Sequence, residues 1–347
     1  MRKFIIAAIG TILLLLLLIG FRNGFWRQDS LPFDSEQKHL NSQFVINFSH
    51  VVAENTPKGL AASKFAELAE KKSDGRIQVE VYPNSLLYSD DDELRALQNG
   101  DIQMIAPSFS KMTRLIPKWE VLDLPYLFRD YEDVRRVFTG KAGDALLDML
   151  DKEDIKGLAL WSNGFKQITT ANKPVRELAD LKGLTIRTMD SDMLAKQFEL
   201  AGARPVKLNF DLVYSRLKNH SLDGEENTIS NIYSKGFYQL QKYMTISDHG
   251  FLGYAVMMNK DFWKSLPEDL QQDVQEAMEE ATLWNLKQSE QMNKDDYQKI
   301  KATSGMDIHT LTQQEQKEWE KTFRALHDYY RGEVDADFLK EIEKEIN

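Results

Sequence analysis

The chain has 347 residues, of which 42% are hydrophobic and 28% charged, a composition typical of a globular protein long enough for two domains. Its formal net charge of −10 argues against a nucleic-acid partner, because neutralising phosphates requires a basic face and no long cluster of lysine and arginine occurs. The lack of cysteine excludes disulfides, thiolate metal ligands, a cysteine nucleophile and a lipidated cysteine anchor.

The N-terminal segment, 1–22, is predicted to be a signal or anchor helix. Arg2 precedes a charge-free run from Phe4 to Phe21 that includes six consecutive leucines and would form a helix about 27 Å long, enough for a thin bilayer core. The run does not end in a small-x-small cleavage site, which favours an uncleaved anchor over the alternative, a cleaved signal peptide. We therefore expect the protein to be tethered at the extracytoplasmic face of the cell membrane, or secreted or periplasmic if the helix is removed. The polar stretch 23–43 is predicted to be a tether.

Strands and helices alternate in the next part of the chain. The pattern predicts strands at Phe44–Val51, Ile77–Pro83 and Ile102–Pro107, and helices that begin at Pro57 and at about Asp90. Such βαβ alternation predicts parallel sheets covered by helices. The acidic run Ser89–Glu93 is interpreted as the capped first turn of the second helix rather than as a metal site.

A second α/β unit begins at Gly157. It runs to about Gly250 and contains predicted strands at Gly157–Asn163 and Leu184–Met189; another strand is predicted after it, at Phe251–Asn259. A helical pattern then runs from Pro267 to about Lys301 without a glycine or an internal proline, a length of about 50 Å. Because that is longer than one domain is wide, we expect this helix to cross between domains.

Three segments between Asn163 and Ser230 place polar side chains at the ends of predicted strands. The segments NGFKQITT, LKGLTIRTMD and LDGEENTIS contain Lys166, Arg187 and Asn227. Arg187 lies inside an alternating strand pattern, so it faces either solvent or a lined cavity. Its planar guanidinium pairs bidentately with carboxylates. A lysine, an arginine and an asparagine together suit a small dianion.

These segments, in this order, carry a family resemblance. With Trp161 before the first and the stretch NIYSKGFY (231–238) after the third, they resemble the extracytoplasmic binding proteins of tripartite ATP-independent periplasmic (TRAP) transporters. The resemblance runs from about Phe44 to about Trp319 and is greatest to the C4-dicarboxylate binders of the DctP type, including the DctB-like proteins of Gram-positive bacteria. It implies an α/β, two-lobed fold like that of periplasmic binding proteins, with the long helix crossing both lobes. Lobe I is expected at 44–163 and 253–292, and lobe II at 164–252 and 293–347.

The resemblance also implies roles for single residues. Arg187, in a strand of the L-x-I-R pattern, would form a salt bridge with a ligand carboxylate, and Asn227, in D-G-x-E-N, would hydrogen-bond ligand oxygens. Lys166 stands where the family more often has arginine, so the second carboxylate would meet a point charge rather than a fork. Ser108 and Phe210 match cleft positions of the family. The alternatives are that the Asp-Gly pair before Asn227 simply forms a turn and that Phe210 packs in the core. Each is compatible with a role in ligand binding.

Strand ends supply three further candidates. Ligands of open α/β sheets bind beyond the carboxyl ends of strands, where His50 and Lys58 flank the first strand-to-helix connection. The alternatives are an ordinary strand-end histidine and a surface lysine. His249, in the segment SDHG, is a third candidate.

The sequence contains no catalytic signature such as H-E-x-x-H, G-x-S-x-G or a P-loop, so we expect neither an enzyme nor a bound cofactor or metal. The resemblance implies a solute-binding protein that captures a C4-dicarboxylate (fumarate, succinate or malate) by cleft closure and presents it to a TRAP-type transporter. The alternative partner is a dicarboxylate-responsive histidine kinase or carrier system, for which the protein would be a co-sensor.

Overall fold

The computed structural model describes residues 43–347, and Phe44–Asn347 form one folded unit. The predicted anchor helix (1–22) and all but the last residue of the predicted tether (23–43) lie outside the described residues. Among residues 43–347, no helix is both long enough and apolar enough to cross a bilayer.

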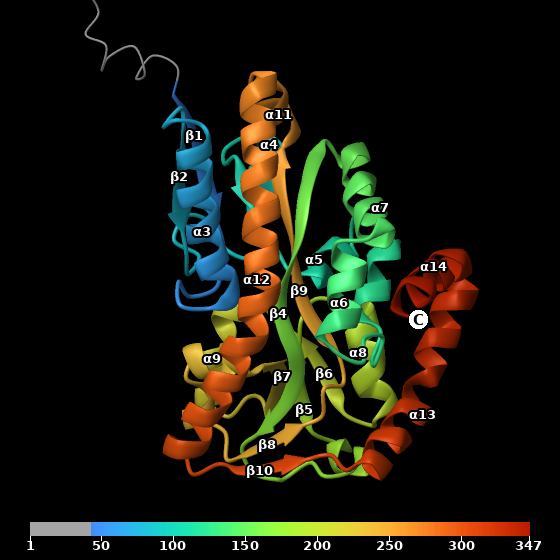
Figure 1. Cartoon of the computed structure of the whole chain (residues 1–347). Coiled ribbons are helices and arrows are strands. Elements are labelled where there is room, and N and C mark those ends of the chain that lie inside the picture. The colour runs from blue at the N-terminus through green and yellow to red at the C-terminus, as the bar shows by residue number, and fades with distance from the viewer. Residues whose placement is uncertain (1–42) are drawn as a thin grey trace, which may run out of the picture. The chain divides into compact units, whose positions relative to one another are not determined.

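The first half of the unit follows the predicted alternation of strands and helices (Figure 1). Strand β1 pairs in parallel with β2 on one side and with β3 on the other. The elements are β1 (Phe44–Ser49), α3 (Pro57–Lys72), β2 (Ile77–Tyr82), α4 (Glu93–Asn99), β3 (Met104–Ile105), α5 (Phe109–Met112), η1 (Pro117–Asp123), α6 (Tyr131–Phe138), α7 (Lys141–Met149) and η2 (Leu150–Glu153). Helix α3 begins where the sequence predicts, because Thr56 accepts a hydrogen bond from Gly59 N and Pro57 occupies the first turn.

Two long strands, β4 (Ile155–Thr170) and β9 (Phe251–Asn259), run through the middle of the unit into both halves (Figure 1). They pair with each other in antiparallel fashion, and β9 also pairs antiparallel with β3. The predicted parallel pairing therefore holds for β1 with β2 and β3, but the sheet as a whole is mixed, because the antiparallel strand β9 inserts at its centre. Every residue of β9 is buried, which explains its continuous apolar sequence.

The second half contains the strand order β4-β7-β5-β6, with β8 also paired to β4 and β10 paired to β8. Its elements are η3 (Leu178–Leu181), β5 (Thr185–Thr188), α8 (Asp192–Leu200), β6 (Arg204–Lys207), α9 (Phe210–Lys218), β7 (Gly224–Thr228), α10 (Ile229–Ser234), η4 (Phe237–Gln239), β8 (Tyr243–Ile246) and β10 (Asp307–Thr310), while α11 (Lys260–Ser265) follows β9. Strand β5 pairs in parallel with β6 and β7, whereas β7 pairs antiparallel with β4.

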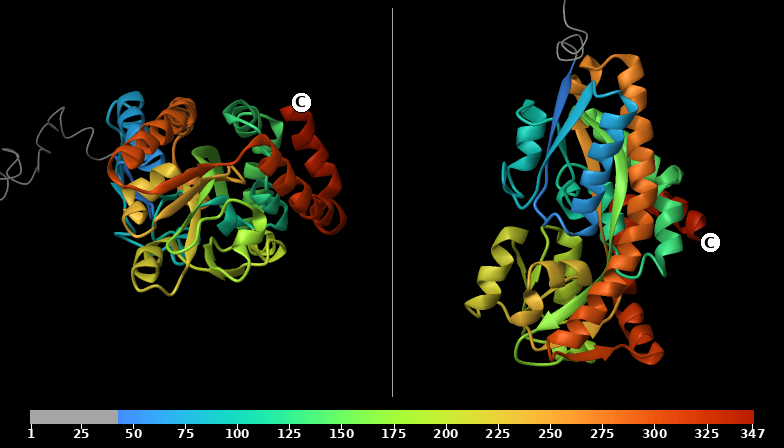
Figure 2. Two further views of the ribbon diagram at one scale, coloured as in Figure 1. Left: turned by 90° about the horizontal axis from the view of Figure 1, so that it is seen from below. Right: turned by 60° about the vertical axis from the view of Figure 1, so that its left-hand side comes forward.

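Helix α12 (Glu268–Thr303) runs along both halves, as predicted (Figures 1 and 2). Asn285 Nδ2 donates to Pro57 O (3.3 Å) in the first half, and Ser230 N donates to Asn293 Oδ1 (3.0 Å) in the second. Two further helices, α13 (Gln313–Tyr330) and α14 (Ala336–Ile346), close the chain, and α14 contacts α6 and α7 of the first half. The predicted lobe boundaries, which put 293–347 in lobe II, stay a prediction.

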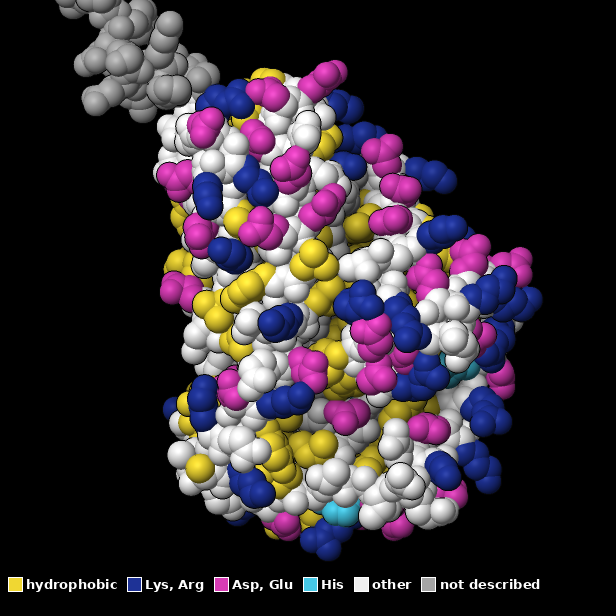
Figure 3. All heavy atoms as spheres, in the orientation of Figure 1, with side chains coloured by type: hydrophobic (Ala, Val, Ile, Leu, Met, Phe, Trp, Pro, Cys, Tyr) yellow, Lys and Arg dark blue, Asp and Glu magenta, His cyan; other side chains and the backbone are white. Residues whose placement is uncertain are grey.

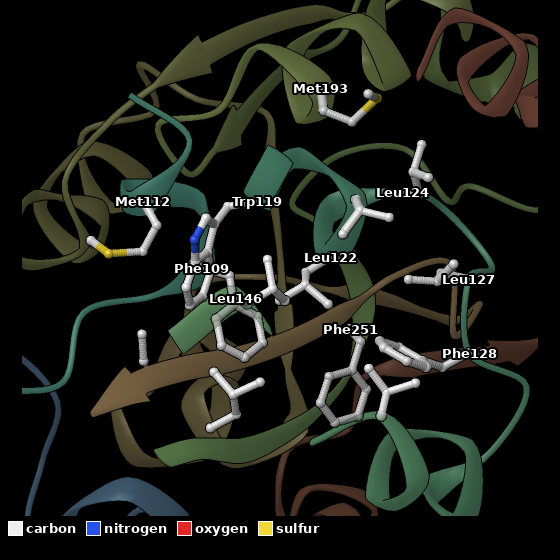
Figure 4. Close-up of a cluster of buried hydrophobic side chains, with 14 of the residues drawn as sticks. Phe109, Met112, Trp119, Leu122, Leu124, Leu127, Phe128, Leu146, Met193 and Phe251 are labelled. Carbon is white, nitrogen blue, oxygen red and sulfur yellow. The ribbon is translucent and has the colours of Figure 1, made fainter. Parts of the chain in front are cut away.

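An aromatic-rich core joins the halves (Figure 4). The rings of Phe128 and Phe251 lie 5.7 Å apart, and those of Phe109 and Trp119 lie 5.8 Å apart. Met193 of α8 belongs to the same buried cluster, so the second half contributes to it. On the outside, acidic and basic side chains intermingle over the visible face (Figure 3). No single-sign field dominates that face, and an anion must be recognised by charges local to a site.

Candidate functional site

A small cavity lies where elements of the two halves meet. The space that the centre of a water molecule can occupy in it is about 30 Å³, room for about one or two waters. The first half contributes the loop after β1, the start of α3, the loop before α4 and the start of α5, while β5, α9, β7 and α10 come from the second half, and β9 forms the wall between them. The lining residues are Val51, Val52, Lys58, Asp90, Ser108, Arg187, Met189, Phe210, Asn227, Asn231, Leu252 and Tyr254.

Arg187 is the strongest anion-binding group at this cavity. It lies on β5 and is only 2% exposed. Its Nε donates to Leu208 O (2.9 Å), whereas its Nη1 has no hydrogen-bond partner among the described residues. Burial lowers the pKa of the guanidinium, while the nearby Glu226 and Glu225 oppose that shift. An arginine stays charged in a protein, so this buried N–H is a donor available to an acceptor that enters the cavity.

Lys58 brings a second cation to the cavity from the first half. It is fully buried, its Nζ donates to Ala106 O (2.8 Å) and lies 3.9 Å from the centroid of the Tyr254 ring. Burial lowers its pKa to about 8, against the opposing charges of Glu93 and Asp90. Gly59 makes this position possible, because a Cβ there would lie 2.4 Å from the carbonyl oxygens of the preceding loop. The lysine is therefore held at the cavity wall, mostly charged at neutral pH.

Three other predicted residues line the same cavity. Asn227 Oδ1 accepts from Thr228 N (3.0 Å) and from Asn231 Nδ2 (2.9 Å), which fixes the orientation of its amide. Ser108 precedes α5, and its hydroxyl makes no capping hydrogen bond to that helix. Phe210 packs edge-on against Phe237, at 6.1 Å between ring centroids, and so belongs to both core and cavity.

Lys166 and His249 lie apart from this cavity's lining. Strand register explains the difference: Arg187 pairs with Glu225 on one face of the sheet, whereas Lys166 shares the opposite face with Glu226. Lys166 Nζ forms a buried ion pair with Glu226 Oε2 (2.7 Å), and His249 Nε2 lies 3.6 Å from the same oxygen. Burial raises the pKa of Glu226, but Lys166 and His249 outweigh it and hold that pKa below its usual range. The structure therefore does not bring Lys166 together with Arg187, and direct ligand contact by Lys166 or His249 stays a prediction.

His50 is fully buried beside the cavity without lining it; the next two residues, Val51 and Val52, form the wall instead. Burial, and then the charge of Lys58, lowers the pKa of His50 to about 3. The imidazole is therefore neutral at physiological pH and supplies no charge to an anion.

The sequence analysis missed several lining residues, among them Asp90, Asn231 and Tyr254. Asp90 was assigned to the first turn of a helix, but α4 begins at Glu93, after a turn in which Asp92 is the N-cap residue without a side-chain capping bond. Glu93 is buried, accepts a hydrogen bond from Ser49 Oγ (2.8 Å) and has its pKa raised to about 7 by burial. The sequence shows that this run is acidic, but only the structure shows that one of its carboxylates, Glu93, is buried against Ser49 and that Asp90 lines the cavity.

A family model described as "Bacterial extracellular solute-binding protein, family 7" matches residues 48–333. The chain belongs to this family. It is 49% identical to the C4-dicarboxylate-binding protein DctB of Bacillus subtilis (strain 168), over 94% of this chain and 93% of that protein. Family 7 proteins are solute-binding components rather than enzymes, in agreement with the sequence analysis.

Solved structures of family members share the fold. A TRAP periplasmic solute-binding protein from Shewanella oneidensis with bound succinate is 40% identical, with a TM-score of 0.84 over 88% of this chain and 100% of that one. A protein of the same description from Pseudomonas aeruginosa with bound L-malate is 34% identical, with a TM-score of 0.80 over 82% of this chain and 99% of that one. The two-lobed α/β fold predicted from the sequence is thus confirmed. Among the described residues, no group of three potential ligands is placed to hold a metal ion.

Proposed function

We propose that this family 7 protein captures a C4-dicarboxylate (fumarate, succinate or malate) by closing its two halves around it, and presents the ligand to a TRAP-type transporter for uptake. The observation that carries the proposal is the buried, unpartnered Nη1 of Arg187 in a cavity that also holds the buried ammonium of Lys58. The two cations come from opposite halves, so a dianion that contacts both favours the closed state.

Charge balance supports a dianion in particular. Among the described residues, carboxylates lie near both cations but none forms an ion pair with Arg187 or Lys58, whereas the two carboxylates of a ligand would pair directly with one guanidinium and one ammonium. In this arrangement Arg187 binds one carboxylate and Lys58 the other, with Asn227 and Ser108 as hydrogen-bonding groups. Lys58 takes the place that the sequence analysis gave to Lys166, whose charge is already balanced by Glu226. The relatives named for, or solved with, C4-dicarboxylates agree with this ligand class.

The small size of the cavity supports closure. The free space in this conformation is small and its lining comes from both halves, so a dicarboxylate can enter only when the halves separate. Polar contacts cross between them near the cavity: Arg114 Nη2 lies 2.5 Å from Asp190 Oδ2, and Asn209 Nδ2 donates to Asp91 Oδ2 (2.6 Å). The described conformation is thus a closed one, and β4, β9 and α12 are the elements that connect the halves during opening.

Calorimetric titration tests the ligand class. The purified protein is titrated with succinate, fumarate and malate, and in parallel with butyrate, which has the same chain length and only one carboxylate. We expect at least one C4-dicarboxylate to bind, and butyrate to bind at least tenfold more weakly, because one of the two cations would then gain no carboxylate partner. Equal binding of butyrate, or no binding of any C4-dicarboxylate, would contradict the proposal.

The membrane attachment is part of the same proposal. The apolar run of 1–22 would stay uncleaved and hold the protein at the outer face of the membrane, with 23–43 as the tether. N-terminal sequencing of the protein extracted from cells distinguishes this from a cleaved signal peptide, since a mature start between Gly20 and Gln43 would exclude the anchor.

The membrane partner follows from the family, in which TRAP subunits receive the solute. The alternative, a co-sensor for a dicarboxylate-responsive histidine kinase or carrier, stays a prediction. The neighbouring genes distinguish the two, because a transporter component is expected beside genes for TRAP membrane subunits and a co-sensor beside a kinase gene.

A further inference from the structure

Asp90 is an unexpected residue in a site for a dianion. It is the one carboxylate among the described residues that line the cavity, together with the cations Arg187 and Lys58. Its side chain is only 10% exposed. A carboxylate at this position repels the carboxylates of a ligand, so it weakens the binding of a simple dianion unless it also makes a favourable contact.

Lys111, which forms the ion pair with Asp90, does not depend on it for a partner. Lys111 Nζ lies 3.3 Å from Asp90 Oδ2, but the same ammonium lies closer to Asp91 Oδ1 (2.7 Å) and donates to Asn209 Oδ1 (3.1 Å). Lys111 would therefore stay paired without Asp90. Its proximity has another effect: it offsets the charge of Asp90, which reduces the repulsion of a dianion while leaving the carboxylate oxygens as hydrogen-bond acceptors.

An acceptor in a buried cavity selects for a ligand that carries a donor. Succinate and fumarate at neutral pH have acceptors only, whereas malate adds one hydroxyl to the same C4 skeleton. A site built to bind a hydroxyl discriminates against the analogue that lacks it, because the buried acceptor is then left unpaired.

The geometry points to Asp90 as a specificity-determining residue, which accepts a hydrogen bond from the hydroxyl of a 2-hydroxy C4-dicarboxylate and so favours malate over unsubstituted C4-dicarboxylates. This inference rests on the proposed function and adds the ligand subclass to it. In this arrangement the two ligand carboxylates bind Arg187 and Lys58, and the hydroxyl, on one of the two carbons between the carboxylates, faces Asp90 in the loop before α4.

The test compares malate with succinate in the parent protein, Asp90→Ala and Asp91→Ala. Asp91 is the matched control, since it contacts the same Lys111 but does not line the cavity. We expect Asp90→Ala to raise the ratio of the Kd for malate to the Kd for succinate by about tenfold or more, and to reduce any preference between D- and L-malate. Asp91→Ala is expected to change both Kd values by the same factor.

The outcomes separate this inference from the proposed function. If the parent binds none of malate, succinate and fumarate, the proposed function fails, and this inference with it; if it binds fumarate but not malate, only this inference is overturned. If the parent binds both and Asp90→Ala leaves the ratio within about threefold, only the role of Asp90 is overturned. Should Asp90→Ala not fold, Asp90→Asn keeps the shape of the side chain and removes its charge. For this variant the ratio of the Kd for malate to the Kd for succinate is expected to rise at least about threefold, and an unchanged ratio overturns the inference.

Discussion

Replacing Arg187 by lysine keeps the positive charge of the cavity and removes the planar fork. In the structure, the guanidinium uses Nε to hold the carbonyl of Leu208 at 2.9 Å, while Nη1 is left for a ligand. A lysine at this position has one nitrogen for both tasks and a shorter reach. Arg187→Lys therefore separates the effect of geometry from that of charge.

The expected loss follows from one charge-assisted hydrogen bond. Such a bond contributes roughly 1.5 to 3 kcal/mol, which corresponds to about a 10- to 150-fold weaker affinity for the dicarboxylate. The upper end applies if the lysine ammonium stays on the Leu208 carbonyl, because the ligand carboxylate then loses its partner altogether. The lower end applies if the ammonium turns to the ligand and leaves the carbonyl unpaired.

Calorimetric titration with succinate measures the change, and thermal unfolding verifies that the fold is intact. Arg204→Lys is the matched control, since Arg204 is exposed on the neighbouring strand β6 and is expected to leave the Kd unchanged. An Arg187→Lys protein that is folded and binds succinate within about threefold of the parent, a shift below roughly 0.7 kcal/mol, would show that Arg187 does not anchor a carboxylate.

Three further predictions concern the charges and the closure. Burial lowers the pKa of Lys58 to about 8, so its ammonium loses a proton as the pH rises through 8. Dicarboxylate affinity should therefore fall between pH 7 and 9, and Lys58→Arg should remove most of this pH dependence. An affinity of the parent that does not change with pH would contradict the role of Lys58. Lys166→Met leaves Glu226 buried without its 2.7 Å partner and should lower the free energy of unfolding by about 3 to 5 kcal/mol in urea titrations. Adding Glu226→Gln to Lys166→Met should restore much of that loss. If the free energy of unfolding of Lys166→Met alone lies within about 1 kcal/mol of the parent value, the ion pair between Lys166 and Glu226 is not needed for stability. Saturating ligand should lower the radius of gyration in small-angle scattering, whereas an unchanged value with binding confirmed would mean that the halves do not close.

Elements with a strong local pattern were predictable from the sequence. Strand β9 has the predicted bounds, Phe251–Asn259, because a fully buried apolar run carries its own signal. Helix α12 was predicted from Pro267 to about Lys301 and spans Glu268–Thr303. Strand β4 was predicted to end at Asn163 but continues to Thr170, through a register shift against β9 between Ser162 and Gly164.

The sequence by itself determined the family, the two-lobed α/β fold and the residue types at the strand ends, because these depend on short motifs and local periodicity. Only the tertiary structure decided which of those residues share a cavity. Alternation along a strand divides side chains between two faces but does not say what covers each face, so Lys166 and Arg187 could not be separated in advance. Lys58 and Asp90 line the same cavity as Arg187 although they lie 129 and 97 residues before it in the sequence, and such long-range packing is what local patterns do not encode.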